Sequence, residues 1–244
     1  QDDFDQALAA VLKHEGGFVD HPADPGGATN RGVTLTVFQR HVPGAGVAEL
    51  QAITDEQVST IYHDDYWAKC RCDQTAAGID YPVFDQAVNF GLGRSISWLQ
   101  AAGAGIDGLI GPETIQLANE TDTSKTVDAM CDDRLAFMQA LRGGRQWEIF
   151  GHGWSRRVAE VRHGGIALAN GRTLDKPHEP PALTSMLRAG DSGHAVRILQ
   201  EALGVPVTGS FNEVTAVRTH QADVGLEVDG LAGKNTFPSL GLSP

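Results

Sequence analysis

The chain has 244 residues, of which 41% are hydrophobic and 20% charged, so a disordered or collagen-like protein is excluded and a buried core is expected. Its 19 basic and 31 acidic residues give a net charge of −12, which argues against a nucleic-acid-binding surface, because such a surface needs clustered positive charge. No apolar run reaches the roughly 20 residues that span a bilayer. The length fits one large domain, or a main domain with a small one.

Most of the chain before residue 170 shows the apolar repeat of amphipathic helices. Asp3 with Gln6, and Thr54 with Gln57, have the spacing of capping boxes. Residues 16–32 break the repeat with glycines and prolines, which predicts a loop or small hairpin. The expected fold is therefore mainly α with this one insertion, and its predicted helices cover residues 3–15, 34–41, 54–67, 80–92, 95–102, 124–141 and 154–169.

A proline-containing stretch indicates a boundary between two domains. Residues 170–182 carry Pro177, Pro180 and Pro181 among polar neighbours and have no apolar repeat, which is typical of a linker. The apolar repeat returns downstream. We therefore predict a main domain over residues 1–169, a linker over 170–182 and a small module over 183–244.

A short motif is repeated in the two predicted domains. Ile106–Thr114 reads IDGLIGPET and follows Gln100, while Val228–Thr236 reads VDGLAGKNT and follows Gln221. A looser third copy begins at Leu199-Gln200. Asp-Gly suits a tight turn, and the second glycine suits entry into a helix, so the repeat predicts a helix–turn–helix packing unit.

Cysteine and histidine spacing gives no support for a metal site or a cofactor. Cys70, Cys72 and Cys131 lack zinc-type pairing and are expected to be reduced thiols, with a bridge from Cys131 to Cys70 or Cys72 as the alternative. The nine histidines include no H-E-x-x-H and no close pair. We therefore expect no metal and no cofactor.

The first predicted helix ends with a carboxylate on its apolar face. Glu15 continues the stripe of Phe4, Leu8 and Val11, and Gly16-Gly17 then stops the helix. Burial and the negative end of the helix dipole both favour the protonated form of such a side chain, as a general acid requires. The alternative is a surface glutamate beyond the last turn.

The loop that follows offers a second carboxylate and a hydroxyl. Asp24 lies in a Pro- and Gly-rich stretch, and Thr29 follows it, so a chain that folds back returns both toward Glu15. Glycosidases use two carboxyl groups in different environments, one as the acid and the other to act on water or to stabilise the positive charge of the sugar. The alternative for Asp24 is a residue that forms a turn before Pro25, and the alternative for Thr29 and Asn30 is a structural role in turn hydrogen bonds.

The same segment resembles a known enzyme family. The matching residues are Glu15-Gly16-Gly17-Phe18-Val19-Asp20, Asp24-Pro25-Gly26-Gly27-Ala28-Thr29-Asn30, Gly32-Val33-Thr34, Tyr66-Trp67, Phe84-Asp85, Ala87-Val88-Asn89-Phe90-Gly91, Asp107-Gly108 and Gly153-Trp154-Ser155-Arg156-Arg157-Val158. On these residues, nearly all of 3–169 is similar to glycoside hydrolase family 108, the peptidoglycan muramidases of phage endolysins and bacterial lysozyme-like proteins.

The resemblance implies a lysozyme-like α+β fold in which Glu15 is the catalytic acid, with Asp24 and Thr29 beside it. In phage-type lysozymes the threonine stands one residue further along, where this chain has Asn30. Asp20 is a rival for the second carboxylate. The motif matches also imply substrate contacts from Asp20, Asn30, Tyr66, Asn89 and Trp154.

Two other parts are similar to peptidoglycan-binding folds. Residues from about 80 to 169 resemble the helical peptidoglycan-binding half that accompanies the catalytic half in this family. Residues 183–244 resemble the three-helix peptidoglycan-binding module, on the residues Leu187-Arg188, Gly190-Asp191-Ser192-Gly193, Val196, Leu199-Gln200, Leu203, Gly209-Ser210-Phe211, Thr215, Val217, Gln221 and Val228-Asp229-Gly230. His220 and Asn212 depart from that module's usual Phe and Gly.

The resemblance to the family implies a muramidase that cleaves the β-1,4 bond between N-acetylmuramic acid and N-acetylglucosamine. The alternatives are a lytic transglycosylase, a non-catalytic wall-binding protein and a chitinase-like enzyme. The expected partner is bacterial peptidoglycan, with no nucleic acid and no membrane span, and the expected state is a monomer. Gln1-Asp2-Asp3 lacks a signal-peptide pattern, so we expect an endolysin made in the host cytoplasm that reaches the wall at lysis.

Overall fold

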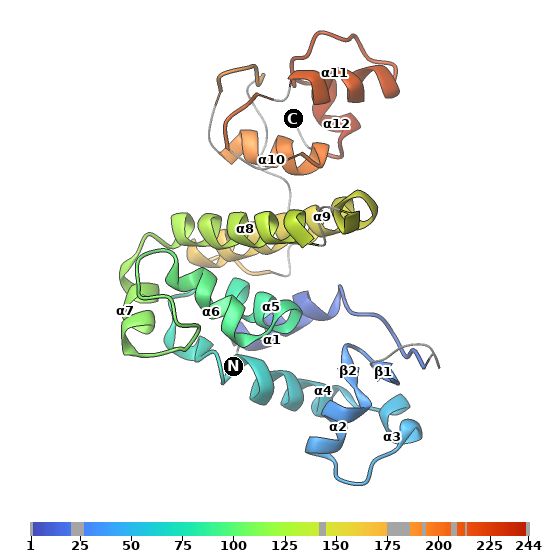
Figure 1. Ribbon diagram of the computed structural model, residues 1–244, viewed down its shortest axis with the longest axis vertical. Coiled ribbons are helices and arrows are strands. Elements are labelled where there is room, and N and C mark those ends of the chain that lie inside the picture. The colour runs from blue at the N-terminus through green and yellow to red at the C-terminus, as the bar shows by residue number, and fades with distance from the viewer. Residues whose placement is uncertain are drawn as a thin grey trace. The chain divides into compact units, whose positions relative to one another are not determined.

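The computed structural model describes residues 2–20, 27–141, 145–174, 186–191, 194–205, 209–212 and 214–242. The chain divides into two compact units: unit 1 is Gln1–Thr126 with Gly165–Asp175, and unit 2 is Val127–Gly164 with Lys176–Pro244. Both are built from helices (Figure 1), which confirms the mainly α fold. The boundaries of 1–169, 170–182 and 183–244 stay a prediction, and part of the expected linker lies outside the described residues.

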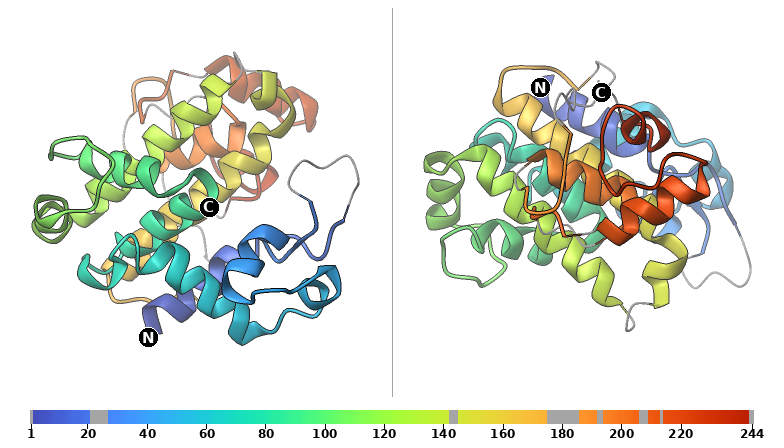
Figure 2. Two further views of the ribbon diagram at one scale, coloured as in Figure 1. Left: turned by 60° about the horizontal axis from the view of Figure 1, so that its bottom comes forward. Right: turned by 90° about the horizontal axis from the view of Figure 1, so that it is seen from above.

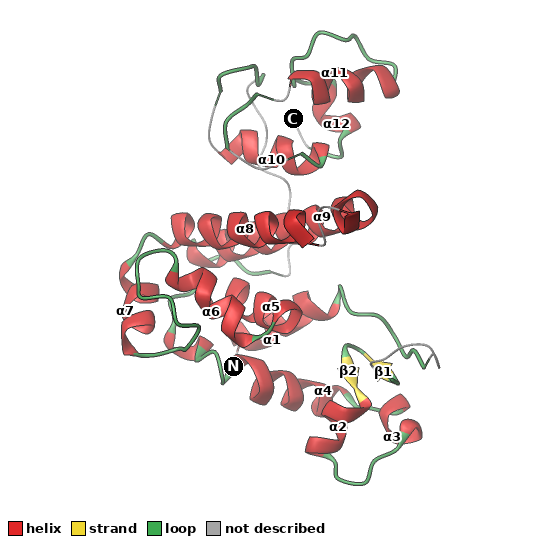
Figure 3. Cartoon of the chain, viewed as in Figure 1, coloured by secondary structure: helices red, strands yellow, loops and turns green. Residues whose placement is uncertain are grey.

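Unit 1 holds the N-terminal helices and the hairpin. Its elements are α1 (Asp2–Leu12), β1 (Thr29–Asn30), β2 (Val33–Thr34), α2 (Leu35–His41), α3 (Val47–Gln51), α4 (Asp55–Tyr62), the π-helical turn η1 (His63–Trp67), the 3₁₀ turn η2 (Cys72–Gln74), α5 (Asp80–Phe90), α6 (Leu92–Gln100) and α7 (Pro112–Glu120). Figure 3 shows the hairpin as the one pair of strands among the described residues. It lies against α2 and α3.

The remaining helices include the longest one among the described residues, α9. They are α8 (Thr123–Ala140), α9 (Arg145–Ala169), α10 (His194–Leu203), α11 (Val214–Asp223) and α12 (Thr236–Ser239). The sequence did not predict α3 and placed the start of α9 too late. Helix α7 begins directly after Gly111, where the repeat predicted entry into a helix. None of the helices in the described part of the chain is long and apolar enough to span a membrane.

The two predicted capping boxes have different outcomes. Thr54 and Gln57 form theirs: the Thr54 hydroxyl accepts from the Gln57 amide at 3.2 Å, and the Gln57 side chain accepts from the Thr54 amide at 3.0 Å. The box at Asp3 and Gln6 is wrong, because α1 already begins at Asp2. The Gln6 side chain instead accepts a hydrogen bond from the Leu174 amide at 3.0 Å.

The core of unit 1 contains a cluster of aromatic rings. Phe4, Trp67 and Phe84 meet edge to face, with ring centroids 5.3–5.8 Å apart. This geometry favours aromatic pairs beyond the area that they bury. The Trp67 indole donates to the Asp73 carboxylate at 2.7 Å, so its polar group is satisfied while the ring is buried.

Asp80, at the start of α5, is a buried carboxylate with an altered pKa. Its Oδ1 accepts from the amides of Gly78 at 2.9 Å and Tyr81 at 2.7 Å. Burial raises the pKa of Asp80 to about 6, although these hydrogen bonds act in the opposite direction. The folded protein therefore holds this proton more tightly than the unfolded chain does.

We expect Asp80→Asn to raise the free energy of unfolding at pH 8 by roughly 2 kcal/mol, because it removes a buried charge and keeps the Oδ1 acceptor. Since the folded pKa is the higher one, the stabilising contribution of Asp80 is complete below about pH 4 and is lost as the pH rises through about 6. Urea unfolding at several pH values tests this. A difference between variant and wild type that does not change with pH would contradict it.

The repeated motif forms the same structure in both units. The Gln100 side-chain amide donates to Asp107 Oδ1, the Leu109 carbonyl and the Thr114 hydroxyl. The Gln221 amide donates to the equivalent Asp229, Leu231 and Thr236. Each glutamine oxygen also accepts from the glycine of the Asp-Gly pair, at 2.9 Å in both copies. The packing unit predicted from the repeat is therefore present twice.

The third copy keeps part of this arrangement. The Gln200 amide donates to the Ser210 carbonyl, and its oxygen accepts from the Gly209 amide, both at 2.9 Å. Gln200 and Gln221 therefore anchor the turns around the small C-terminal core of unit 2. Buried members of that core are Leu187, Val196, Ile198, Leu199, Phe211, Val217, Ala232 and Phe237.

Unit 2 also contains a buried charge cluster that joins α8, α9 and α10. Figure 2 shows the ribbons of these helices from two further sides. Arg162 of α9 has no exposed side-chain surface and lies 2.7 Å from Asp128, 2.7 Å from Asp132 and 3.1 Å from Glu201. Arg197 of α10 also pairs with Asp132. Burial raises the pKa of Glu201 to about 7, against the attraction of Arg162.

All three cysteines are free and buried, as reduced thiols. This confirms the first of the two expectations, and no bridge joins Cys131 to Cys70 or Cys72. Burial raises the pKa of Cys131 to about 12 and that of Cys72 well above its ordinary value.

Candidate functional site

The hairpin lies at the end of the irregular segment after α1. Thr29 pairs with Thr34 and Asn30 with Val33, and the two-residue turn of Arg31 (φ 51°) and Gly32 (φ 76°) has the left-handed backbone of a type I′ turn. Val19 and Thr29 also exchange two backbone hydrogen bonds of 2.8 Å. The chain therefore folds back as the sequence predicted, although the hairpin begins later and extends beyond Gly32.

Glu15 lies just beyond α1 and next to the hairpin turn. The helix ends at Leu12, three residues earlier than predicted, because the amides of His14 and Glu15 bond to Val11 and Leu12 in a tight turn. The half-buried Glu15 carboxyl approaches Gly32 so closely that a Cβ at position 32 would lie 2.8 Å from its Oε2. Glu15 thus follows the helix and faces the turn of the hairpin.

Tyr62, from the last turn of α4, borders the same space. A Cβ at Gly32 would collide with its hydroxyl, which donates to the Arg31 carbonyl at 2.9 Å. The Tyr62 ring is buried, and the Tyr66 ring lies 5.8 Å from it. Helix α4, the hairpin turn and the end of α1 therefore meet at the Glu15 carboxyl.

Tyr66 belongs to η1, where the expected helix over residues 54–67 becomes a π turn. Burial is the main reason that the pKa of Tyr66 is raised, and the negative charges of Asp65 and Glu15 add to the effect while Arg40 opposes it. The Tyr66 ring lies beside Tyr62, whose hydroxyl borders the same turn as the Glu15 carboxyl. The contact of Tyr66 with a substrate stays a prediction.

Asp65 organises the cations beside this site. Burial alone would raise the pKa of Asp65, but hydrogen bonds from Lys69 and His41 and the charge of Arg40 lower it. Its carboxylate lies 2.6 Å from the Lys69 ammonium, 3.0 Å from the Arg40 guanidinium and 3.2 Å from the His41 ring. These contacts hold α2 against η1 and so support the surroundings of Tyr66.

The other residues predicted near Glu15 have mixed positions. The Thr29 hydroxyl donates to the Gly27 carbonyl at 3.2 Å, and Asp20 is exposed. Asn30 is buried, and its side-chain amide donates to the carbonyls of Leu50 and Gln51, both at 3.1 Å. Asn30 therefore fastens the hairpin to α3, which is a structural use of the residue. Asp24 lies outside the described residues.

Two predicted substrate contacts lie elsewhere in the sequence. Asn89, on α5, is exposed, and its amide donates to the Asp85 carbonyl at 2.8 Å. Trp154 belongs to α9 in unit 2, with its ring 6.4 Å from that of Trp147. Their roles toward a substrate stay predictions.

Sequence reasoning missed Tyr62 and gave Gly32 no role of its own. An Arg-Gly pair between two short extended segments was the available signal for the turn. The spacing of Tyr62 and Tyr66, four residues apart on one helical face, was the signal for the tyrosine pair.

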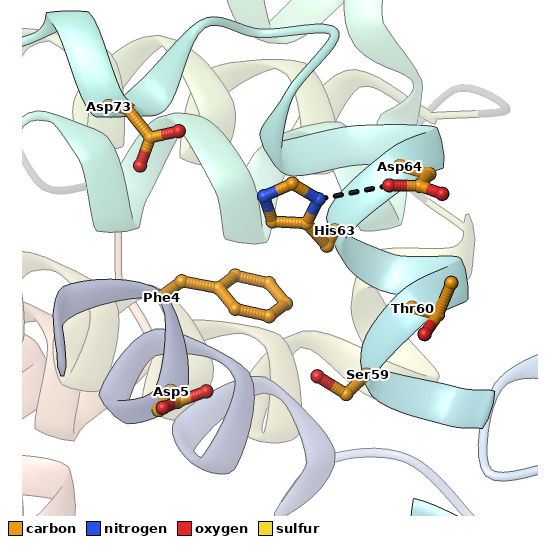
Figure 4. Close-up of a pocket in the computed structure, with 7 residues that line it drawn as sticks. All are labelled: Phe4, Asp5, Ser59, Thr60, His63, Asp64 and Asp73. Carbon is orange, nitrogen blue, oxygen red and sulfur yellow. Dashed lines mark hydrogen bonds and ion pairs between the residues drawn. The ribbon is translucent and has the colours of Figure 1, made fainter. Parts of the chain in front are cut away.

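A separate cavity of about 410 Å³ lies between the start of α1 and α4 (Figure 4). The His63 ring lies 5.1 Å from Phe4 and 3.0 Å from the Asp64 carboxylate. The lining residues are Phe4, Asp5, Ser59, Thr60, His63, Asp64 and Asp73, and they include none of the predicted site residues. Because Phe4 lies near the start of α1 and Glu15 lies beyond its end, this cavity is distinct from the Glu15 site.

Comparison with known proteins assigns this arrangement to a family. The profile of the family described as Glycosyl hydrolase 108 matches residues 8–91, which include Glu15, the hairpin and both tyrosines. A solved structure described as Brucella abortus SagA is 36% identical, with a TM-score of 0.59 and coverage of 68% of this chain and 95% of that one. The chain belongs to the glycosyl hydrolase 108 family.

Membership of the glycosyl hydrolase 108 family makes the chain a glycoside hydrolase, and a peptidoglycan hydrolase is the activity that fits this family. None of the curated proteins compared with the chain is a match. The matched segment ends at the C-terminus of α5, so it contains Glu15 and leaves residues 92–244 outside it. The C-terminal module is therefore assigned no function by this match.

Proposed function

We propose that this glycosyl hydrolase 108 protein is an N-acetylmuramidase that cleaves the β-1,4 bond between N-acetylmuramic acid and N-acetylglucosamine. The observation that supports it most is the Glu15 carboxyl, half-buried and enclosed by the hairpin turn and Tyr62 within the matched segment. A carboxyl group shielded from water on one side is suited to donate a proton to a glycosidic oxygen.

In this proposal Glu15 protonates the leaving oxygen as the glycosidic bond breaks. Asp24 orients or activates the water that attacks the sugar, or stabilises its positive charge, and Thr29 assists. The bridge between Val19 and Thr29 supports this arrangement, because it holds Val19, which follows Glu15 in the chain, beside the hairpin. Asp20 is the alternative second carboxylate.

The C-terminal residues 183–244 are proposed to bind the wall. A weak binding module tethered to a catalytic domain raises the local concentration of an insoluble polymer without adding contacts to the reacting bond. We propose that the protein acts on the bacterial wall as an endolysin released at lysis.

The products formed from purified murein test the bond and the reaction together. A muramidase consumes water and leaves a reducing N-acetylmuramic acid end, so we expect mass spectrometry to show that end. A 1,6-anhydro-muramic end would show a lytic transglycosylase instead, and a reducing N-acetylglucosamine end would show cleavage of the other glycosidic bond. A turbidity assay on permeabilised cells separates both enzymes from a wall-binding protein without activity.

A further inference from the structure

Three parts of unit 1 meet where a Cβ at position 32 would lie: the turn after α1, the hairpin turn and the end of α4. The Glu15 carboxyl and the Tyr62 hydroxyl both border this point, so a side chain at position 32 would strike both groups. Neither residue is near Gly32 in sequence. The tertiary fold therefore brings the acid, a phenol oxygen and a bare stretch of backbone together at one point.

Tyr62 fixes this point from the side of the core. Its ring is 2% exposed and lies 6.3 Å from Phe84, and its hydroxyl uses its one proton to bond the Arg31 carbonyl at 2.9 Å. A buried phenol with a satisfied hydrogen bond has little freedom to move. Tyr62 thus holds the Arg31–Gly32 turn at a set distance from the Glu15 carboxyl.

Space, more than backbone conformation, accounts for glycine at position 32. Arg31 has a φ of 51° and carries a full side chain, so the left-handed conformation in this turn does not by itself require glycine. Gly32, with a φ of 76°, differs because a Cβ there would meet Tyr62 and Glu15. The missing side chain makes room for the carboxyl.

We propose that Tyr62 and Gly32 are positioning residues for Glu15, the hydroxyl anchoring the hairpin turn and the glycine leaving the space in which the carboxyl lies. Neither residue needs to touch the substrate in this role. The expected effect of this positioning on catalysis rests on the proposed function of Glu15 as the acid. The positioning of the Glu15 carboxyl by Tyr62 and Gly32 does not depend on that function.

Glycine substitutions separate the space at position 32 from backbone strain. Gly44 has a φ of 84°, and a Cβ at that position would have no neighbour within 4 Å, so it matches Gly32 in strain but not in crowding. We expect Gly32→Ala to lower kcat on murein about 100-fold, as a displaced acid should, and Gly44→Ala to keep wild-type kcat. Equal kcat values for the two variants would overturn the role of Gly32.

Tyr62→Phe removes the hydroxyl and retains the buried ring. A displaced acid stabilises the transition state less well but has little effect on the affinity for the substrate. We therefore expect kcat to fall about 10-fold with KM nearly unchanged. Thermal unfolding of the same preparation gives the folded fraction, by which kcat is corrected. A corrected kcat equal to that of wild type would overturn the role of Tyr62.

A readout independent of activity keeps this proposal distinct from the proposed function. We expect Glu15→Gln to move the NMR signal of the Gly32 amide in the wild-type background, and to move it less when Tyr62→Phe is also present. An identical response in wild type and Tyr62→Phe would overturn the positioning role. If murein is not cleaved at all, the proposed function fails and the NMR result still decides the geometry.

Discussion

Glu15→Gln is expected to release fragments from murein about a hundred to ten thousand times more slowly than the wild type, with the fold intact. Glutamine has nearly the same shape as glutamate but cannot donate the proton that the departing sugar oxygen needs. Because Glu15 lies in a turn and is only half-buried, the substitution should change the free energy of unfolding little. Initial rates on purified murein and urea unfolding measure the two effects.

Glu120→Gln is a matched control for this experiment. Glu120 is exposed at the end of α7 in the same unit, and the Gln116 amide donates to it at 3.0 Å, a bond that glutamine can also accept. The control should keep wild-type rates. Full activity in Glu15→Gln would contradict the assignment of the acid and redirect attention to Asp24 and Asp20.

Arg162→Met is expected to destabilise unit 2 by about 3–5 kcal/mol. Arg162 lies between Asp128, Asp132 and Glu201, and its removal leaves carboxylates close together without their main counter-charge. A methionine fills most of the volume, so the loss reports charge more than a cavity. Urea unfolding followed by a signal from unit 2 measures it.

Arg156→Met provides the control on the same helix. The Arg156 side chain is 78% exposed and lies 3.9 Å from Glu160, a surface pair whose loss should cost at most about 0.5 kcal/mol. Adding Glu201→Gln to Arg162→Met should restore part of the lost stability, because it removes one unpaired buried charge. Equal losses in the two arginine variants would contradict a role for the cluster.

The cluster also predicts a dependence on pH. Burial raises the pKa of Glu201 to about 7, so the folded protein binds this proton more tightly than the unfolded chain. The stability that Glu201 contributes is complete below its ordinary range near pH 4–5 and is lost as the pH rises through about 7. Glu201→Gln should flatten this part of the stability profile.

The features that could be predicted from the sequence depend on residues close together in the chain. The Thr54–Gln57 box and the glutamine-centred turns at Gln100 and Gln221 each involve at most about one or two helical turns and a loop, so the spacing of the residues carries the information. The stripe that singled out Glu15 is also local. Its last step was less accurate, because the chain leaves the helix after Leu12.

The surroundings of Glu15 depend on contacts between distant segments. Neither Tyr62 nor Gly32 carries a periodic or motif-like signal for contact with Glu15, because α4 and the hairpin meet only in the tertiary structure. The π turn at His63–Trp67 was equally hidden, because a single turn of this kind is too short for the apolar repeat to distinguish it from an α-helical turn. The Asn30 side-chain amide donates to backbone carbonyls of α3, a contact between distant segments that the sequence did not show, and its contact with substrate stays a prediction.

The buried cysteine thiols can report on transient unfolding of the protein. Thiolates are the reactive form of cysteine, and the raised pKa values of Cys72 and Cys131 leave few of them in the folded molecule. An alkylating reagent should therefore modify these positions chiefly in molecules that have transiently opened. Because Cys70 and Cys72 belong to unit 1 and Cys131 to unit 2, peptide mapping of the label would time the unfolding of each unit without any added probe.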